Sequence, residues 1–187
     1  GFSSSEIRPK VIPGEYTARI NYEGLKLQEK ITVVGDNRIN MPIDDYRKKL
    51  KALLTLRDLL SRTHKLIDKV SFSADQLEDL IKKLEDVSSQ DSKDAMKIHK
   101  KILEHKFQFL MRPPPSMTYR QKPRLREEIR SLMSAIDKTT NPPTAPQIER
   151  IASLIKEVDE QEETILSNES ELLNLNRKLS SLPQIIY

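Results

Sequence analysis

The fold of this chain is decided by residues 46–88, which read YRKKLKALLTLRDLLSRTHKLIDKVSFSADQLEDLIKKLEDVS. Along this stretch, positions that are almost all apolar recur at alternating spacings of three and four residues. They are Leu53, Leu56, Leu60, Thr63, Ile67, Val70, Ala74, Leu77, Ile81, Leu84 and Ser88. This period predicts one long amphipathic helix, roughly 65 Å in length at ~1.5 Å per residue, packed against partner helices.

The rest of the chain contains three further amphipathic segments that can cover this seam. A second helix is expected to follow the polar turn at 88–92 and to end near Met111, before Pro113. A third helix is expected from Arg124 to about Lys138. Thr144 and Gln147 form a capping box for a fourth helix, which should run close to 182–183.

The residues expected to face inward follow the same helical spacing. In the third helix they are Leu125, Ile129, Leu132, Met133 and Ile136; in the fourth, Ile148, Ile151, Ile155, Val158, Ile165, Leu172 and Leu179. The apolar positions of the second helix are Ala95, Ile98, Ile102 and Phe109, with Met96, Leu103, Phe107 and Leu110 on the adjoining row. The predicted class is therefore mainly α, a long-helix up-down bundle of three to four helices preceded by a small β-hairpin.

Two features of the helices admit alternatives. Ser73 and Gln76 form a capping box that would start a new helix, but the seam passes through without losing phase, which favours one continuous or gently kinked helix. Glu162 and Glu169 interrupt the seam of the last helix. They either meet a basic partner helix or mark where the helix extends into solvent, and the second interpretation is the default.

A β-hairpin is predicted ahead of the helices. From Glu15 onward apolar and polar residues alternate up to Tyr22, Glu23 and Gly24 form a turn, and the alternation resumes to Val33. Because two strands alone are marginal in water, the hairpin must lie on the helices, pair with another chain, or be the end of a larger β domain. The expected divisions are a flexible lead-in at 1–10, the hairpin at 11–40 as the end of a small β domain, and the helical bundle at 41–187.

Composition limits the classes of function. The chain has 187 residues, a formal net charge of +4 and no Cys, which excludes disulfides and thiolate zinc sites. Residues 142–187 are acidic, with eight Asp or Glu against four Lys or Arg, whereas the earlier helices are basic. This asymmetry favours packing between helices over nucleic-acid binding. No run of about 18 apolar residues exists, so no membrane insertion is expected. No signal peptide is recognisable, and a start at Gly1 without an initiator Met suits a processed chain.

No residue pattern points to catalysis. His64, His99 and His105 lack the spacing of a helical metal pair, and the carboxylate pairs Glu78-Asp79, Glu85-Asp86 and Glu162-Glu163 belong to polar helix surfaces. There is no nucleophile elbow and no phosphate-binding Gly loop. We therefore predict no catalytic, cofactor-binding or metal-binding residue and no cofactor.

Short motifs over most of residues 11–165 resemble a known family. Ile12-Pro13-Gly14-Glu15-Tyr16, Lys30-Ile31-Thr32-Val33 and Asp36-Asn37-Arg38 resemble the segment that follows the β-propeller in bacterial sialidase-like, BNR-repeat or sortilin-like repeat proteins, with Asn37 where the family usually has Pro. Leu56-Arg57-Asp58-Leu59-Leu60 and Pro143-Thr144-Ala145-Pro146-Gln147 resemble its later helical region. The resemblance implies a C-terminal accessory region, and no catalytic residue of the family is carried over.

The function expected from these observations is that of a non-catalytic helical module of a larger exported protein, periplasmic or at the cell surface. It would give structural support or a surface for protein interaction. The partner would be the propeller domain of the parent chain or another protein, and oligomers are allowed. The alternative is an autonomous coiled-coil adaptor that binds another helical protein. An enzyme is not expected.

Overall fold

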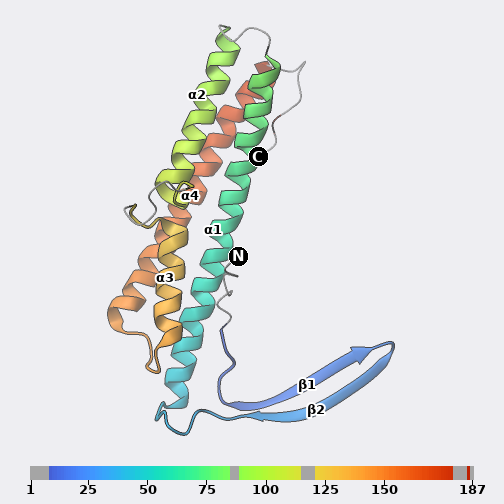
Figure 1. Ribbon diagram of the computed structural model, residues 1–187, viewed down its shortest axis with the longest axis vertical. Coiled ribbons are helices and arrows are strands. Elements are labelled where there is room, and N and C mark those ends of the chain that lie inside the picture. The colour runs from blue at the N-terminus through green and yellow to red at the C-terminus, as the bar shows by residue number, and fades with distance from the viewer. Residues whose placement is uncertain (1–8, 85–88, 115–120, 179–184, 186–187) are drawn as a thin grey trace. The chain divides into compact units, whose positions relative to one another are not determined.

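A computed structural model describes residues 9–84, 89–114, 121–178 and 185. Its elements are β1 (Gly14–Tyr22), β2 (Leu25–Val33), α1 (Ile43–Lys83), α2 (Gln90–His105), the π-helix η1 (Lys106–Leu110), α3 (Leu125–Lys138) and α4 (Ala145–Lys178) (Figure 1). The predicted class, a helical bundle after a hairpin, is confirmed. Most of the predicted lead-in, Ser88, Leu179 and the expected end of the last helix lie outside the described residues.

The chain divides into two compact units. Unit 1 comprises residues 1–57 and 131–151, and unit 2 comprises residues 58–130 and 152–187. Three helices, α1, α3 and α4, continue from one unit into the other. Each unit has its own buried apolar side chains and is described separately below.

Unit 1 contains the hairpin and three helical segments. Its buried side chains are Ala52 and Leu53 with Leu56 from α1, Met133 and Ile136 from α3, and Ile151 from α4. Lys49 caps the end of α3, since its Nζ donates to the carbonyl oxygens of Asp137 (3.0 Å) and Thr139 (2.5 Å). The predicted start of α4 is confirmed as well, because the Gln147 side chain accepts a hydrogen bond from the Thr144 backbone N–H at 2.9 Å.

One inward residue in unit 1 was predicted wrongly. Ile148 is 48% exposed, whereas Ile151 is 6% exposed. A step of three residues turns a helix by about 60° less than a full turn. The side chains of Ile148, Ile151 and Leu154 therefore point in directions that differ by about 60° at each step around α4. Ile148 therefore falls beyond the edge of the buried arc that the later residues define.

In unit 2 the seam of α1 is buried as predicted, with Thr63, Ile67, Val70, Ala74 and Leu77 all below 9% exposure. The helix does not break at the Ser73 capping box. Instead, Ser73 Oγ donates to the carbonyl of Lys69 (3.1 Å), and Gln76 Nε2 donates to that of Phe72 (3.3 Å). Both side chains bond backward to their own helix, and α1 is continuous from Ile43 to Lys83.

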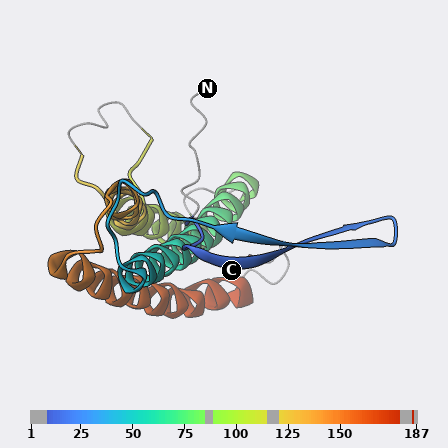
Figure 2. The ribbon, with the colours of Figure 1, turned by 90° about the horizontal axis from the view of Figure 1, so that it is seen from below.

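Ion pairs show how the helices of unit 2 are oriented. Arg62 on α1 binds Asp159 and Glu162 on α4, and Lys69 binds Glu169, so α1 and α4 run parallel. Lys101 on α2 binds Glu171, and Asp94 binds Lys178, so α2 runs antiparallel to α4. Figures 1 and 2 both show these ribbons side by side. The default interpretation of Glu162 and Glu169 was therefore wrong, because both meet a basic partner helix.

The second helix departs from the prediction at its end. The α-helical part stops at His105, and a π turn follows in which the N–H of Met111 donates to the carbonyl of Lys106 at 3.0 Å. A π turn holds more residues than an α turn, so it rotates the side chains that follow it. Leu110 is fully buried, whereas two other apolar residues of this segment, Phe109 (41% exposed) and Met96 (37%), are exposed.

Candidate functional site

The hairpin of unit 1 has two chemically different faces. The register pairs Tyr16 with Ile31, Ile20 with Leu27 and Tyr22 with Leu25. Because side chains alternate across a strand, these residues share one face with Ala18 and Glu29, and the other face carries only polar and charged residues between Glu15 and Thr32. Glu23 (φ 45°) and Gly24 (φ 85°) form the two-residue turn, and positive φ at both positions is typical of a type I′ turn.

The apolar face of the hairpin is exposed. We call it the hairpin face; its members are Tyr16, Ala18, Ile20, Tyr22, Leu25, Leu27, Glu29 and Ile31. The exposed fractions are 62% for Ile20, 68% for Tyr22, 62% for Leu25, 58% for Leu27 and 46% for Ile31. Within unit 1, the helical segments therefore leave this face uncovered. Of the charged groups on β1 and β2, Glu29 is the one on this face.

The chain that leaves β2 is tightly constrained. Asp36 accepts hydrogen bonds from Arg38 at the backbone N (3.0 Å), Nε (3.0 Å) and Nη2 (2.6 Å), and the Ile39 N–H donates to the Asp36 carbonyl. The Arg38 guanidinium lowers the pKa of Asp36. A Cβ at Gly35 would lie 3.0 Å from the Tyr46 hydroxyl. These contacts fix the path from the hairpin to the first turn of α1.

A groove of about 600 Å³ lies between α2 and α4 in unit 2. Lysines line it, but each of the following is paired: Lys101 with Glu171 (2.6 Å), Lys178 with Asp94 (3.0 Å) and Lys100 with Glu104 (3.7 Å). The pKa of Lys178 is raised by its hydrogen bond to Asp94. Three of the four lysines that line the groove are thus engaged by carboxylates.

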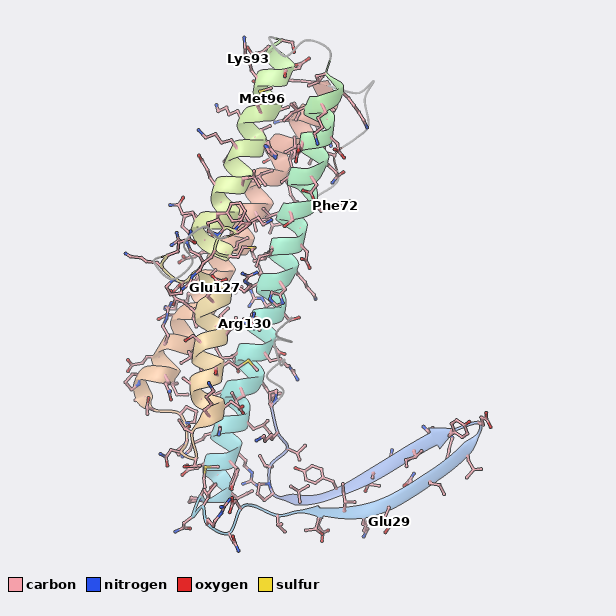
Figure 3. All side chains as sticks on the ribbon, in the orientation of Figure 1. Glu29, Phe72, Lys93, Met96, Glu127 and Arg130 are labelled. Atoms are coloured by element: carbon pink, nitrogen blue, oxygen red, sulfur yellow. The ribbon has the colours of Figure 1, made fainter. Side chains whose placement is uncertain are left out.

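Glu127 connects η1 to α3. Its Oε2 accepts from the backbone N–H groups of Arg112 (3.2 Å) and Arg124 (3.1 Å), and its Oε1 accepts from Arg126 Nε (2.8 Å). Figure 3 places Glu127 at the start of α3. The carboxylate thus satisfies backbone donors at a helix start, which is a structural use of charge.

The three histidines differ in how deeply they are buried. His64 is exposed and His99 is half-buried, whereas His105 is buried at the end of α2, with its ring centroid 5.3 Å from that of Phe109. In the described part of the chain His105 Nε2 has no hydrogen-bond partner. Burial lowers the pKa of His105, and the positive charge of Lys101 lowers it further.

No group of three or more His, Asp or Glu side chains among the described residues is placed to hold a metal ion. No described helix combines the length and the hydropathy required to cross a bilayer. The hairpin face and the helix surfaces are the features described above that could bind a partner.

Comparison with known proteins finds no matching family model, no matching curated protein and no matching solved structure.

Proposed function

We propose that this chain is a non-catalytic helical module of a larger exported β-propeller repeat protein, in which the helices give support and the hairpin face packs on β structure of the same polypeptide. The observation that carries the proposal is the exposure of the hairpin face. A strand pair with one apolar and one polar face is the pattern of a half-buried sheet, and such a face is stable when another layer covers it.

The residues of the hairpin favour a β partner for this face. Tyr, Ile and Leu alternate on both strands at the spacing used between packed sheets, where two inner faces interdigitate. Glu29 lies opposite Ala18 within this face, so the covering layer requires a basic or hydrogen-bonding group at that point. The resemblance of residues 12–38 to the strand pair behind a propeller agrees with this assignment.

The proposal is tested by site-specific photo-crosslinking in source cells. A photoreactive residue at Leu27, on the hairpin face, is compared with one at Gln28, on the polar face. We expect Leu27 to crosslink to a β-rich segment of the same, larger polypeptide, and Gln28 to give far less product. Crosslinks from Leu27 only to helices of this chain would refute the proposal, as would an immunoblot band of the native protein at 21.6 kDa.

The assignment as non-catalytic has a separate test. The whole chain is assayed against sialoside and other glycoside substrates under conditions in which a propeller sialidase is active. We expect no turnover, because the two carboxylates that the described residues bring together on α4, Asp159 and Glu162, are both bound by Arg62. Glycoside hydrolysis that follows this chain through purification would contradict the proposal.

A further inference from the structure

The two strands of the hairpin each have an outer edge. In the described part of the chain β1 and β2 form a sheet of two strands (Figure 1). Tyr22 and Leu25 flank the two-residue turn, so they exchange backbone hydrogen bonds, and every second pair of the register does the same. The backbone N–H and C=O groups of the residues between these pairs point away from the other strand. On β1 these residues are Glu15, Thr17, Arg19 and Asn21; on β2 they are Lys26, Gln28, Lys30 and Thr32.

The two outer edges differ in how well they resist pairing with a further strand. Charged side chains on an edge strand, Lys above all, oppose such pairing, and so does a charge on its apolar face. β2 carries Lys26 and Lys30 along its edge and Glu29 on the hairpin face. β1 carries one acid and one base, Glu15 and Arg19, and both lie on the polar face. The edge of β1 is therefore the one suited to accept another strand.

The outward residues of β1 complement a second copy of themselves. When two antiparallel copies of β1 are centred on Thr17, this residue lies opposite itself, and Glu15 lies opposite Arg19 of the other copy on both sides of the centre. Thr–Thr and opposite-charge pairs are both favourable across strands. Centring the copies on Glu15 or on Arg19 would instead set like charges opposite each other. Two copies of β2 centred midway between Lys26 and Lys30 would also set like charges opposite each other.

Glu15 and Arg19 are exposed and available for such a contact. Within the hairpin, Glu15 lies opposite Thr32 and Arg19 lies opposite Gln28, so neither has an opposite charge directly across from it. Lys30 is diagonal to Glu15, but no ion pair joins the two among the described residues. Glu15 and Arg19 of one chain are four residues apart on a strand, about 13 Å, and so cannot pair with each other.

We propose that β1 pairs with β1 of a second copy of this chain, so that two hairpins form one four-stranded antiparallel sheet. A two-fold axis perpendicular to the sheet passes between the two Thr17 residues. Such a contact uses the same edge on both copies and consumes it, so the assembly closes as a dimer. The two hairpin faces then lie on the same side of the sheet as one wider apolar face. The dimer does not require this face to be covered, so it is independent of the proposed function.

The pairing is short. Thr17 with Thr17, and Glu15 with Arg19 on either side, exchange backbone hydrogen bonds between the copies. The next pair outward would join Asn21 to Pro13, which has no N–H to donate. An edge contact of this length is weak or transient. We expect a dissociation constant on the order of 10–100 μM, rising with salt because the charged pairs are exposed.

The test uses single cysteines, because the chain has none of its own. Opposed residues of a hydrogen-bonded antiparallel pair have Cα atoms about 5.5 Å apart, a separation that a disulfide spans. The whole chain with Thr17→Cys is held at about 100 μM in a glutathione redox buffer, where disulfides form reversibly. We expect a covalent dimer as the main species. Lys30→Cys, the matched control on the same face of β2, should give at least about fivefold less, because two β1 strands separate the Lys30 residues of the two copies.

Further variants test the register and the charges. Glu15→Cys mixed with Arg19→Cys should give mainly the mixed disulfide and little of either homodimer, because copies of the same residue lie about 13 Å apart in this register. In the Thr17→Cys chain, Glu15→Lys should lower the yield of dimer about fivefold, and adding Arg19→Glu should restore it. Since the two residues are too far apart to meet within one chain, this restoration reports a contact between copies.

Several results would overturn the dimer: equal yields from Thr17→Cys and Lys30→Cys, no restoration by Arg19→Glu, or a wild-type chain that sediments only as a monomer at about 500 μM. The photo-crosslinking from Leu27 is a separate readout. A monomeric Thr17→Cys chain in which Leu27 still crosslinks to a β-rich segment would refute the dimer and leave the proposed function standing. A Thr17→Cys dimer in which Leu27 crosslinks only to helices of this chain would do the reverse.

Discussion

Removing the guanidinium of Arg62 tests whether ion pairs hold α1 and α4 together. Arg62 donates from Nε to Glu162 Oε1 (2.9 Å), and from Nη2 to Glu162 Oε2 (2.7 Å) and Asp159 Oδ1 (2.6 Å). These hydrogen bonds raise the pKa of Arg62 above its usual range. Arg62→Met keeps the aliphatic stem over the core and removes all three bonds.

The expected magnitude follows from geometry and exposure. A two-pronged Arg–carboxylate pair is stronger than a single contact, but Arg62 and Glu162 are each 36% exposed and Asp159 is 52% exposed, so water screens the charges. We therefore expect Arg62→Met to lower the free energy of unfolding by about 1–2 kcal/mol. The coupling between Arg62→Met and Glu162→Gln should be about 1 kcal/mol in a double-mutant cycle.

The assay is urea unfolding followed by far-ultraviolet circular dichroism, since the chain has no Trp. The coupling should shrink in 1 M NaCl, where the Debye length is ~3 Å. Lys82→Met is the control: Lys82 pairs with Glu78 and Asp79 on its own helix and should contribute about 0.5 kcal/mol or less. A coupling below about 0.3 kcal/mol at low salt would show that the apolar seam alone sets the α1–α4 contact.

Two further predictions concern His105 and Lys49. Folding lowers the pKa of His105. Between the ordinary His pKa of about 6.5 and the lower folded-state pKa, the unfolded chain therefore binds more protons than the folded chain. The free energy of unfolding should fall as the pH drops through this range. His105→Leu should remove up to about 1.4 kcal/mol per pH unit of that slope, as pH-dependent urea unfolding will measure. Lys49→Met should lower the free energy of unfolding by about 1 kcal/mol, because it leaves the carbonyls of Asp137 and Thr139 without their donor; equal thermal midpoints for Lys49→Met and wild type would contradict this.

The helices could be predicted from the sequence because the spacing of their apolar residues is a local pattern. The seam from Leu53 to Leu77 fixes both the type and the inward side of α1, and most of its residues are buried. The errors arise where a non-local or rare feature acts. Phe109 is exposed within a π-helix that no pattern in the sequence predicted, and Ile148 lies at a helix start where a step of three residues carries it off the buried arc.

The candidate surfaces could be predicted from the sequence only in part. Alternation predicted which hairpin residues share a face, but whether that face is covered depends on the rest of the fold. Leu166 and Leu173 each follow a buried residue, Ile165 and Leu172, so they resemble a second inward row. Predicting that this second row is exposed requires the parallel register of α1 and α4, which depends on the connections between them and on contacts distant in sequence.

The ion pairs also explain why α1 and α4 have one register. A heptad seam can slide by seven residues and still set Leu against Leu, so the apolar residues alone leave the register weakly specified. Sliding α4 by seven residues in one direction would place Glu162 opposite Lys69, but it would place Ile155 opposite Arg62. Sliding it the other way would set Glu169 against Arg62 but Asn176 against Lys69. Either slip loses an opposite-charge pair.

The loss of an ion pair on sliding explains the role of the two Glu residues in the seam of α4. Replacing Glu162 and Glu169 by Leu would lengthen the apolar stripe and, on hydrophobicity alone, would strengthen packing. It would also remove the groups that distinguish the native register from its neighbours, and it would leave Arg62 and Lys69 beside apolar side chains. The two acidic residues therefore contribute more to the uniqueness of the α1–α4 contact than to its strength, which is why a pattern that scores only apolar spacing places them in solvent.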